Sequence, residues 1–204
     1  MDILQKLKNN QRRIGLTGGI ASGKTTITNY IRKHKNIPIL DADHFSRELI
    51  KPNTYGYKKI LDYFGNKIID NSNSEREINR KLLRKIIFKH SASKEWIEKL
   101  LHPLIKKRMI EECSQYRNNQ TIVLVIPLLF EAKFEDICTE IWLVKCPKEI
   151  QKKRLITRDK ISEKEAYESI NLQLSFEEKR KFSDIILDNS DDQNKWINKI
   201  KELH

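Results

Sequence analysis

Residues 18–25 read GGIASGKT, which matches the phosphate-loop pattern G-x-x-x-x-G-K-[ST]. A short apolar run at residues 13–17 precedes the loop and predicts a buried strand, and residues 24–33 predict a helix directly after it. Such a loop folds around phosphate because backbone N–H groups and the positive end of a helix both face the anion. The stretch therefore predicts a nucleotide-binding α/β core. The structural alternative is a glycine-rich turn with an incidental lysine.

Each position of the loop has a physical task. Gly18 and Gly23 permit unusual backbone dihedral angles and a close approach of the chain to phosphate. Lys24 can place its ammonium on the β and γ phosphates of ATP, and the Thr25 hydroxyl can ligate Mg²⁺, the expected cofactor. The loop residues expected to bind ATP are Gly19, Ala21, Ser22, Gly23, Lys24, Thr25 and Thr26.

The chain is strongly basic. Its 204 residues carry 40 Lys and Arg against 28 Asp and Glu, a formal net charge of +12. This excess fits a nucleic-acid surface, a site for a polyanionic small molecule, or lysines on solvated helix faces. The basic residues are scattered among glutamates and form no stripe with interleaved aromatic residues, which argues against nucleic acid as a partner.

Several protein classes are disfavoured by what the chain contains. Its three cysteines form no C-x-x-C pair, so zinc or thioredoxin-like chemistry has no support. The N-terminus has no apolar core of a secretory signal, and the longest apolar run, residues 122–130, contains Pro127 and is too short to span a bilayer. We expect a cytoplasmic protein with no membrane partner.

Further apolar runs alternate with helical patterns along the chain. The alternation predicts an α/β fold with a parallel sheet. The interval from about residue 53 to 118 carries helix signals and no strand signal, so it predicts a helical insertion between two parts of the core, residues 1–52 and 119–204. The additional predicted strands are residues 37–40, 122–126, 141–144 and 184–187.

Helix ends are marked by capping patterns and prolines. Ser-x-x-Glu predicts capping boxes that begin at Ser74, Ser162 and Ser175. Pro103 predicts a kink or break within a helical stretch at residues 94–116, and Pro147 predicts the first position of a helix.

Two carboxylates follow the second predicted strand. Asp41 and Asp43 can hold Mg²⁺ near a bound triphosphate or accept a proton from an attacking hydroxyl. Their spacing fits an ordinary helix cap equally well.

Three basic side chains allow two interpretations each. Arg154 and Arg158 lie four residues apart on a predicted helix and can clamp a triphosphate, although adjacent lysines also fit a solvated basic face. His102 lies in the helical insertion, where a structural role is the usual one.

Other phosphate-loop classes lack their second motifs. The chain has no N-K-x-D guanine signature, and the predicted strand at residues 122–126 is followed by Pro127 rather than Asp. GTPases and ATPase motors are therefore disfavoured. A phosphate-loop switch that binds nucleic acid and another nucleoside or nucleotide kinase remain as alternatives to the assignment that follows.

Six motifs in order resemble the dephospho-coenzyme A kinases, within the phosphate-loop nucleoside and nucleotide kinases. They are GLTGGIASGKTT, LDADHFSREL, LLHPLI, VIPLLFE, QKKRLITRD and SDIILDNS, spread over residues 14–189. The resemblance implies an α/β, phosphate-loop NTPase-type three-layer fold with a helical substrate-binding insertion and a small lid at about residues 148–180. It also implies transfer of the γ-phosphoryl of ATP to the ribose 3′-hydroxyl of dephospho-coenzyme A, the last step of coenzyme A biosynthesis.

The resemblance also implies roles for single residues. Asp43 is expected to orient or deprotonate the 3′-hydroxyl, and Asp41 to be structural or in the metal's outer shell. Lys24 and Arg154 join Asp43 as expected catalytic residues. Beyond the loop, the expected ATP contacts are Arg154, Arg158 and Asn189. The expected acceptor contacts are Thr17, Asp43, Arg47, His102, Pro127, Leu128, Leu129, Phe130 and Glu131.

One position departs from the family pattern. Ala21 stands where the family usually has glycine, and alanine does not adopt a positive φ cheaply. Thr25 replaces the commoner serine and keeps the hydroxyl.

Overall fold

The structure is a computed structural model that describes residues 4, 7, 10–70, 75–116, 120–190 and 194–203. It divides into two compact units. Unit 1 consists of Met1–Asp41 and Glu112–His204, and unit 2 is Ala42–Glu111. Both unit boundaries lie earlier in the chain than the insertion boundaries predicted near residues 53 and 118.

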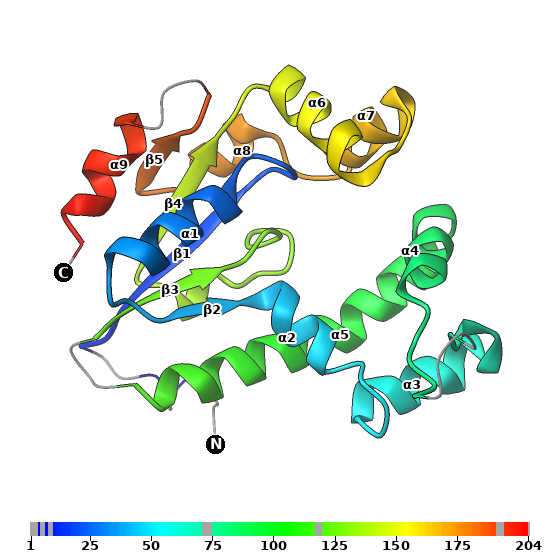
Figure 1. The fold of residues 1–204 in the computed structure, drawn as a ribbon. Coiled ribbons are helices and arrows are strands. Elements are labelled where there is room, and N and C mark those ends of the chain that lie inside the picture. The colour runs from blue at the N-terminus through cyan, green and yellow to red at the C-terminus, as the bar shows by residue number, and fades with distance from the viewer. Residues whose placement is uncertain are drawn as a thin grey trace. The chain divides into compact units, whose positions relative to one another are not determined.

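Unit 1 contains a five-stranded parallel sheet in the order β2-β3-β1-β4-β5 (Figure 1). All five predicted strands are confirmed, with ends that differ by one or two residues. They are β1 (Arg12–Gly18), β2 (Ile39–Asp41), β3 (Thr121–Val125), β4 (Glu140–Lys145) and β5 (Ile185–Asp188).

The strand order places the phosphate loop at a central position. β1 lies between β3 and β4, with Leu16 opposite Val125 and Gly18 opposite Val144. β2 pairs with β3 and ends at Asp41. The carboxyl ends of parallel strands meet at one edge of the sheet, so the loop after Gly18 begins at the edge where ligands bind in open α/β sheets.

Helices supply the rest of both units. In unit 1, α1 (Lys24–His34) and α9 (Asn194–Lys201) pack through Ile27, Ile31, Trp196 and Ile200 against a core formed by the sheet. The helices of unit 1 are α1 (Lys24–His34), α6 (Lys148–Asp159), α7 (Glu163–Asn171), α8 (Phe176–Arg180) and α9 (Asn194–Lys201). Short 3-10 turns lie at Asn66–Ile68 and Glu135–Ile137.

Unit 2 has a separate apolar core. Its helices are α2 (Ala42–Glu48), α3 (Tyr55–Phe64), α4 (Arg80–Lys89) and the larger part of α5 (Ser91–Ser114). α3 contributes Tyr57, Ile60 and Phe64 to this core, α4 contributes Leu83, and α5 contributes Ile97. In the part of the chain that is described, no helix combines the length and hydropathy needed to cross a bilayer.

The predicted helix ends have mixed outcomes. Capping boxes at Ser162 and Ser175 are confirmed. Ser74 lies outside the described residues, and α4 begins at Arg80, where the N-cap Asn79 accepts a hydrogen bond from Leu82 N–H at 2.9 Å.

The prolines also differ from expectation. α5 does not end at Pro103 but continues through it, which excludes a break, and the kink that was the other predicted outcome stays a prediction. Pro147 is the residue before α6 rather than its first position.

Candidate active site

The phosphate loop between β1 and α1 contains backbone conformations that favour glycine. Gly23 has φ 101° and Ala21 has φ 56°. Alanine therefore occupies the left-handed region at the position where the family pattern has glycine, at a cost of about 1–2 kcal/mol. Gly23 is also the N-cap of α1 and supplies no side-chain cap. The first N–H groups of α1 are therefore suited to receive an anion.

Two polar side chains of the loop, those of Ser22 and Lys24, are turned in towards the loop. Lys24 Nζ donates to Gly18 O at 2.8 Å and to Gly19 O at 3.0 Å, so its ammonium lies over the loop. Ser22 Oγ is buried and has no hydrogen-bond partner among the described residues. Thr25 is exposed in the first turn of α1. The loop thus gathers a cation, a hydroxyl and helix N–H groups, which together suit a phosphate chain.

Asn189, at the end of β5, supports the loop from one side. Its Nδ2 donates to Ser22 O at 2.9 Å, and its Oδ1 accepts from Trp196 Nε1 at 3.1 Å. The side chain is buried, with only 6% of the residue exposed. A Cβ at Gly23 would collide with Asn189 Nδ2, which is a second reason for glycine there. Asn189, expected to contact ATP, is thus engaged with the loop itself.

Of the two arginines of α6, Arg154 contacts the same loop and Arg158 pairs with Asp159. Arg154 Nη1 donates to Ser22 O at 3.4 Å, and Arg158 Nε donates to Asp159 Oδ1 at 2.7 Å. An open cavity of about 500 Å³ brings the arginines together with the loop. Its lining consists of Ala21, Gly23, Thr25, Lys153, Arg154, Thr157 and Arg158. The cavity has the size of a small-molecule site. Besides Thr25, its polar lining consists of three basic side chains and one hydroxyl, those of Lys153, Arg154, Arg158 and Thr157.

A second support reaches the loop from the segment after α7. Gln173 Oε1 accepts a hydrogen bond from Ile20 N–H at 2.7 Å. The next residue, Leu174, donates its N–H to Glu131 Oε1 at 3.0 Å. The same carboxylate pairs with Lys179 Nζ at 2.9 Å, and the Lys179 side chain is only 1% exposed. Glu131, expected at the acceptor, thus connects the turn after β3 with Leu174 and Lys179.

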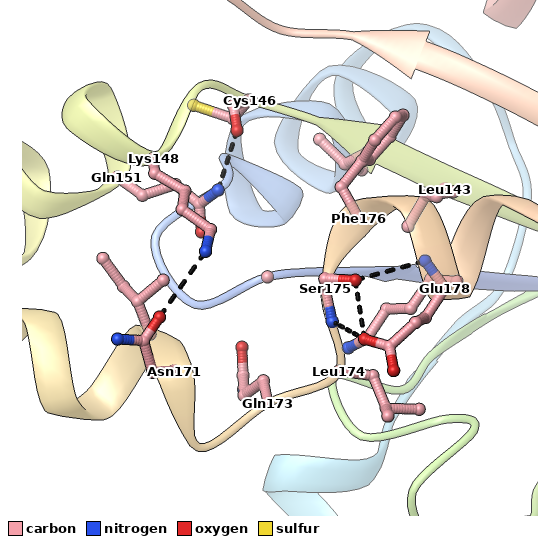
Figure 2. A pocket seen from close by; sticks show the side chains of 14 residues that line it. Leu143, Cys146, Lys148, Gln151, Asn171, Gln173, Leu174, Ser175, Phe176 and Glu178 are labelled. Atoms are coloured by element: carbon pink, nitrogen blue, oxygen red, sulfur yellow. Dashed lines mark hydrogen bonds between the residues drawn. The ribbon is translucent and has the colours of Figure 1, made fainter.

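A second cavity, of about 240 Å³, opens beside these supports (Figure 2). Figure 2 shows Gln151 and Lys148 from α6 on one side and the segment from Asn171 to Glu178 on the other. Gln151 Nε2 donates to Cys146 O at 2.7 Å, which holds that side chain beside Gly19. The cavity lies between the start of α6 and the segment after α7, and Lys148 Nζ links the two sides by donating to Asn171 Oδ1 at 3.5 Å.

The turn after β3 contributes both buried and accessible residues. Thr17 is fully buried, and its hydroxyl donates to Pro127 O at 3.3 Å. Leu129 is also fully buried, whereas Pro127 and Leu128 are half-buried. Phe130 is 9% exposed. Thr17 and Leu129 therefore support the turn from the protein interior, and neither side chain is accessible to a ligand in this conformation.

The remaining expected residues belong to unit 2. Asp43 lies in the first turn of α2 and Arg47 lies one turn later, and both are exposed on the same face of the helix. His102 lies in α5, where burial lowers the pKa of its imidazole and the nearby Glu98 carboxylate opposes that change. The lowered pKa favours the neutral ring at pH 7.

Three contributors to the site were not predicted from the sequence. Gln173 and Lys179 each contact a residue that is distant in the sequence, Ile20 and Glu131 respectively. Trp196 is buried and donates a hydrogen bond to Asn189. A glutamine, a lysine among lysines and a tryptophan in an amphipathic helix carry no local signal of such roles.

Comparisons with known proteins agree with this architecture. The sequence profile of the family described as dephospho-CoA kinase matches residues 12–195. A dephospho-CoA kinase from Prochlorococcus marinus (strain MIT 9312) is 87% identical over 204 residues, covering 100% of both chains.

Two solved structures share the fold over nearly the full length. TT1252 from Thermus thermophilus is 25% identical with a TM-score of 0.78 and covers 95% of this chain and 96% of its own. A dephospho-CoA kinase from Campylobacter jejuni is 26% identical with a TM-score of 0.67, covering 94% of this chain and 96% of its own. With a phosphate loop on β1, the profile match and relatives of this identity, the chain belongs to the dephospho-CoA kinase family.

Proposed function

We propose that the protein transfers the γ-phosphoryl group of ATP to the ribose 3′-hydroxyl of dephospho-CoA, giving CoA and ADP. The observation that carries the proposal is the phosphate loop. Its Lys24 ammonium lies over the loop carbonyls, and the arginines of α6 line the same cavity. The identity of the acceptor, dephospho-CoA, is inferred from membership of the dephospho-CoA kinase family.

On the donor side, unit 1 provides positive charge around the triphosphate. Lys24 moves from Gly18 O and Gly19 O to the β and γ phosphates, and Arg154 stabilises the charge that develops in the transition state. Arg158 adds a second guanidinium from the same cavity. The loop N–H groups hold the phosphates in place, which lowers the entropic part of the barrier.

On the acceptor side, the carboxylate of Asp43 orients the 3′-hydroxyl and accepts its proton as the oxygen–phosphorus bond forms. The bond between the γ phosphorus and its bridging oxygen breaks, and ADP leaves. Arg47 lies on the same face of α2 as Asp43 and contacts the acceptor. Pro127, Leu128 and Phe130 provide an apolar wall, and neutral His102 provides a polar contact.

Mg²⁺ accompanies ATP in this proposal. The described residues contain no group of three or more His, Cys, Asp or Glu side chains arranged to hold a metal ion. The exposed Thr25 hydroxyl at the start of α1 fits a magnesium ion that takes most of its oxygen ligands from phosphates and water. Such an ion supplies charge neutralisation at the β and γ phosphates.

The reaction is tested by product mass and by acceptor choice. Incubation with ATP, Mg²⁺ and dephospho-CoA is expected to give CoA, and excess EDTA is expected to abolish its formation. At saturating ATP, kcat/KM for dephospho-CoA is expected to exceed that for adenosine, because contacts to the pantetheine arm position the reacting hydroxyl. Comparable values for the two acceptors would overturn the acceptor assignment and leave the kinase assignment intact.

A further inference from the structure

The C-terminal helix α9 reaches the phosphate loop through one side chain. Trp196 is 1% exposed, and its Nε1–H donates to Asn189 Oδ1 at 3.1 Å. Asn189 Nδ2 in turn donates to Ser22 O at 2.9 Å. We name this series of two hydrogen bonds, from Trp196 through Asn189 to Ser22, the α9 relay. It connects α9 to the middle of the loop.

The relay determines which way the Asn189 amide faces. An asparagine amide has an accepting oxygen and a donating nitrogen, whereas an indole N–H can only donate. Trp196 therefore holds Oδ1 on its own side and leaves Nδ2 for Ser22 O. Without the indole donor, a rotated amide would place Oδ1 against the Ser22 carbonyl oxygen, and two acceptors repel each other. The indole thus selects the amide orientation that supports the loop.

The orientation of the Ser22 carbonyl matters because of the peptide that follows it. In a trans peptide, the carbonyl oxygen and the next N–H point in opposite directions. With Ser22 O held towards Asn189, the N–H of Gly23 must point away from Asn189. Phosphate loops bind their ligand with backbone N–H groups of this kind. The relay therefore helps to orient a hydrogen-bond donor of the loop, alongside the longer bond of 3.4 Å from Arg154 Nη1 to the same Ser22 O.

We infer that Trp196 is a positioning residue for ATP, because its indole N–H acts through Asn189 to keep the Gly23 N–H turned towards the bound phosphates. The inference rests on the ATP site proposed above. Trp196 lies just beyond residues 12–195, the part of the chain that the family profile matches.

The chain contains a matched control for Trp196. Trp142 in β4 is 2% exposed and belongs to the same apolar core. Its Nε1 also donates to a side chain, Glu140 Oε2, at 3.0 Å. Trp142→Phe and Trp196→Phe remove the same atoms and one indole hydrogen bond each, but only Trp196 leads to the loop. A difference between the two variants in ATP binding therefore reports the relay rather than general destabilisation.

The experiment measures kcat, KM for ATP, KM for dephospho-CoA and Tm for both variants. Trp196→Phe is expected to raise KM for ATP by about three- to tenfold, the value of one hydrogen bond. Because the loop holds the phosphates in the ground state and the transition state alike, kcat should change little. Trp142→Phe should leave KM for ATP unchanged. An unchanged KM in Trp196→Phe, or an equal rise in both variants, would overturn the inference.

A double-mutant cycle tests whether Trp196 acts through Asn189. In an Asn189→Ala background, Trp196→Phe should cause no further rise in KM for ATP, whereas multiplied effects would show that the two residues act separately. If Trp196→Phe does not fold, Asn189→Asp tests the same relay without loss of volume. It should raise KM for ATP, because a carboxylate oxygen replaces the donor at Ser22 O, and an unchanged KM would refute the relay. Absence of CoA formation by the unmodified protein would instead refute the proposed function.

Discussion

At the scale of single residues, Lys24 is expected to matter for chemistry and hardly at all for folding. Its ammonium donates to the loop carbonyls of Gly18 and Gly19, and its side chain is partly exposed. Lys24→Ala should lower kcat about 10²–10³-fold, because a charge aimed at the transition state is lost. Tm should shift by no more than about 2 °C. The matched control is Lys33→Ala at the exposed end of α1, and a similar loss of kcat there would contradict the assignment.

Asp43 and Asp41 form a second matched pair. Asp43→Asn keeps the shape of the side chain but removes the base, so kcat should fall about 10²–10⁴-fold. Asp41→Asn at the end of β2 should have a clearly smaller effect. Steady-state kinetics of both variants decide the matter. Equal losses, or a larger loss at Asp41, would mean that the base is assigned to the wrong carboxylate.

Ala21 tests the strain of the loop. Glycine would relieve a left-handed conformation that costs alanine about 1–2 kcal/mol, but it would also remove a partly buried methyl worth about 0.8 kcal/mol. Ala21→Gly should therefore change the free energy of unfolding by less than about 1 kcal/mol. Ala21→Val should destabilise by about 1–3 kcal/mol, because a β-branched residue tolerates positive φ poorly. Urea unfolding measures both changes, and a valine variant as stable as the parent would argue against the positive φ.

At the scale of elements, the capping box of α7 predicts a pH-dependent contribution to stability. Ser162 Oγ accepts from Glu165 N–H at 3.2 Å, and Ser162 N–H donates to Glu165 Oε2 at 2.9 Å. The backbone N–H of Ser162, followed by its hydroxyl, lowers the pKa of Glu165 below its ordinary 4.5. A lowered pKa stabilises the fold above the ordinary value, and this contribution is lost as the pH falls through the lowered value.

Ser162→Ala should therefore lower Tm by about 2–4 °C at pH 7. The difference from the parent should shrink as the pH is taken below 4.5, the ordinary value for Glu165. Thermal melts at several pH values measure it. Ser169→Ala, within α7, is the control and should not lower Tm. A loss of Tm in Ser162→Ala that is independent of pH would show that the Ser162 hydroxyl does not help to lower the pKa of Glu165.

The elements also show what local sequence can predict. The strands of the sheet were predictable because β-branched and apolar residues run together between turn residues, as in β3. The start of α4 was not, since Asn79 rather than an earlier serine caps it. Pro103 lies within α5, where a proline pattern alone predicts a kink or a break.

The candidate site also contains some residues that local sequence predicts and others that it does not. The phosphate loop is visible as a motif because phosphate chemistry restricts which residues serve there, whereas Asp43, Arg154 and Arg158 are singled out by the resemblance to the family and not by local pattern. The bond from Ile20 N–H to Gln173 joins residues 153 positions apart. Such contacts arise only when the chain has folded, so no local pattern encodes them.

At the scale of the whole molecule, the two apolar cores predict separable functions. Ile60 is fully buried in the core of unit 2, and Ile27 is fully buried in that of unit 1. Replacing a buried isoleucine by alanine costs about 2–5 kcal/mol. Ile60→Ala should therefore reduce kcat/KM for dephospho-CoA while the Kd for ATP changes little, and Ile27→Ala should weaken ATP binding.

Calorimetric titration with ATP and steady-state kinetics with dephospho-CoA separate these outcomes. If both variants lose ATP binding and acceptor turnover to the same extent, the two units do not divide the substrates between them.

The packing of α9 has a consequence for how far this protein can be shortened. A chain cut after Lys195 would retain every residue that the family profile matches, including the phosphate loop and Asn189. It would lose Trp196, Ile200 and Leu203, each no more than 1% exposed, and would leave bare the apolar side chains they cover. An uncovered apolar surface promotes aggregation. Such a truncated protein would carry a full set of kinase motifs and still be expected to precipitate on expression.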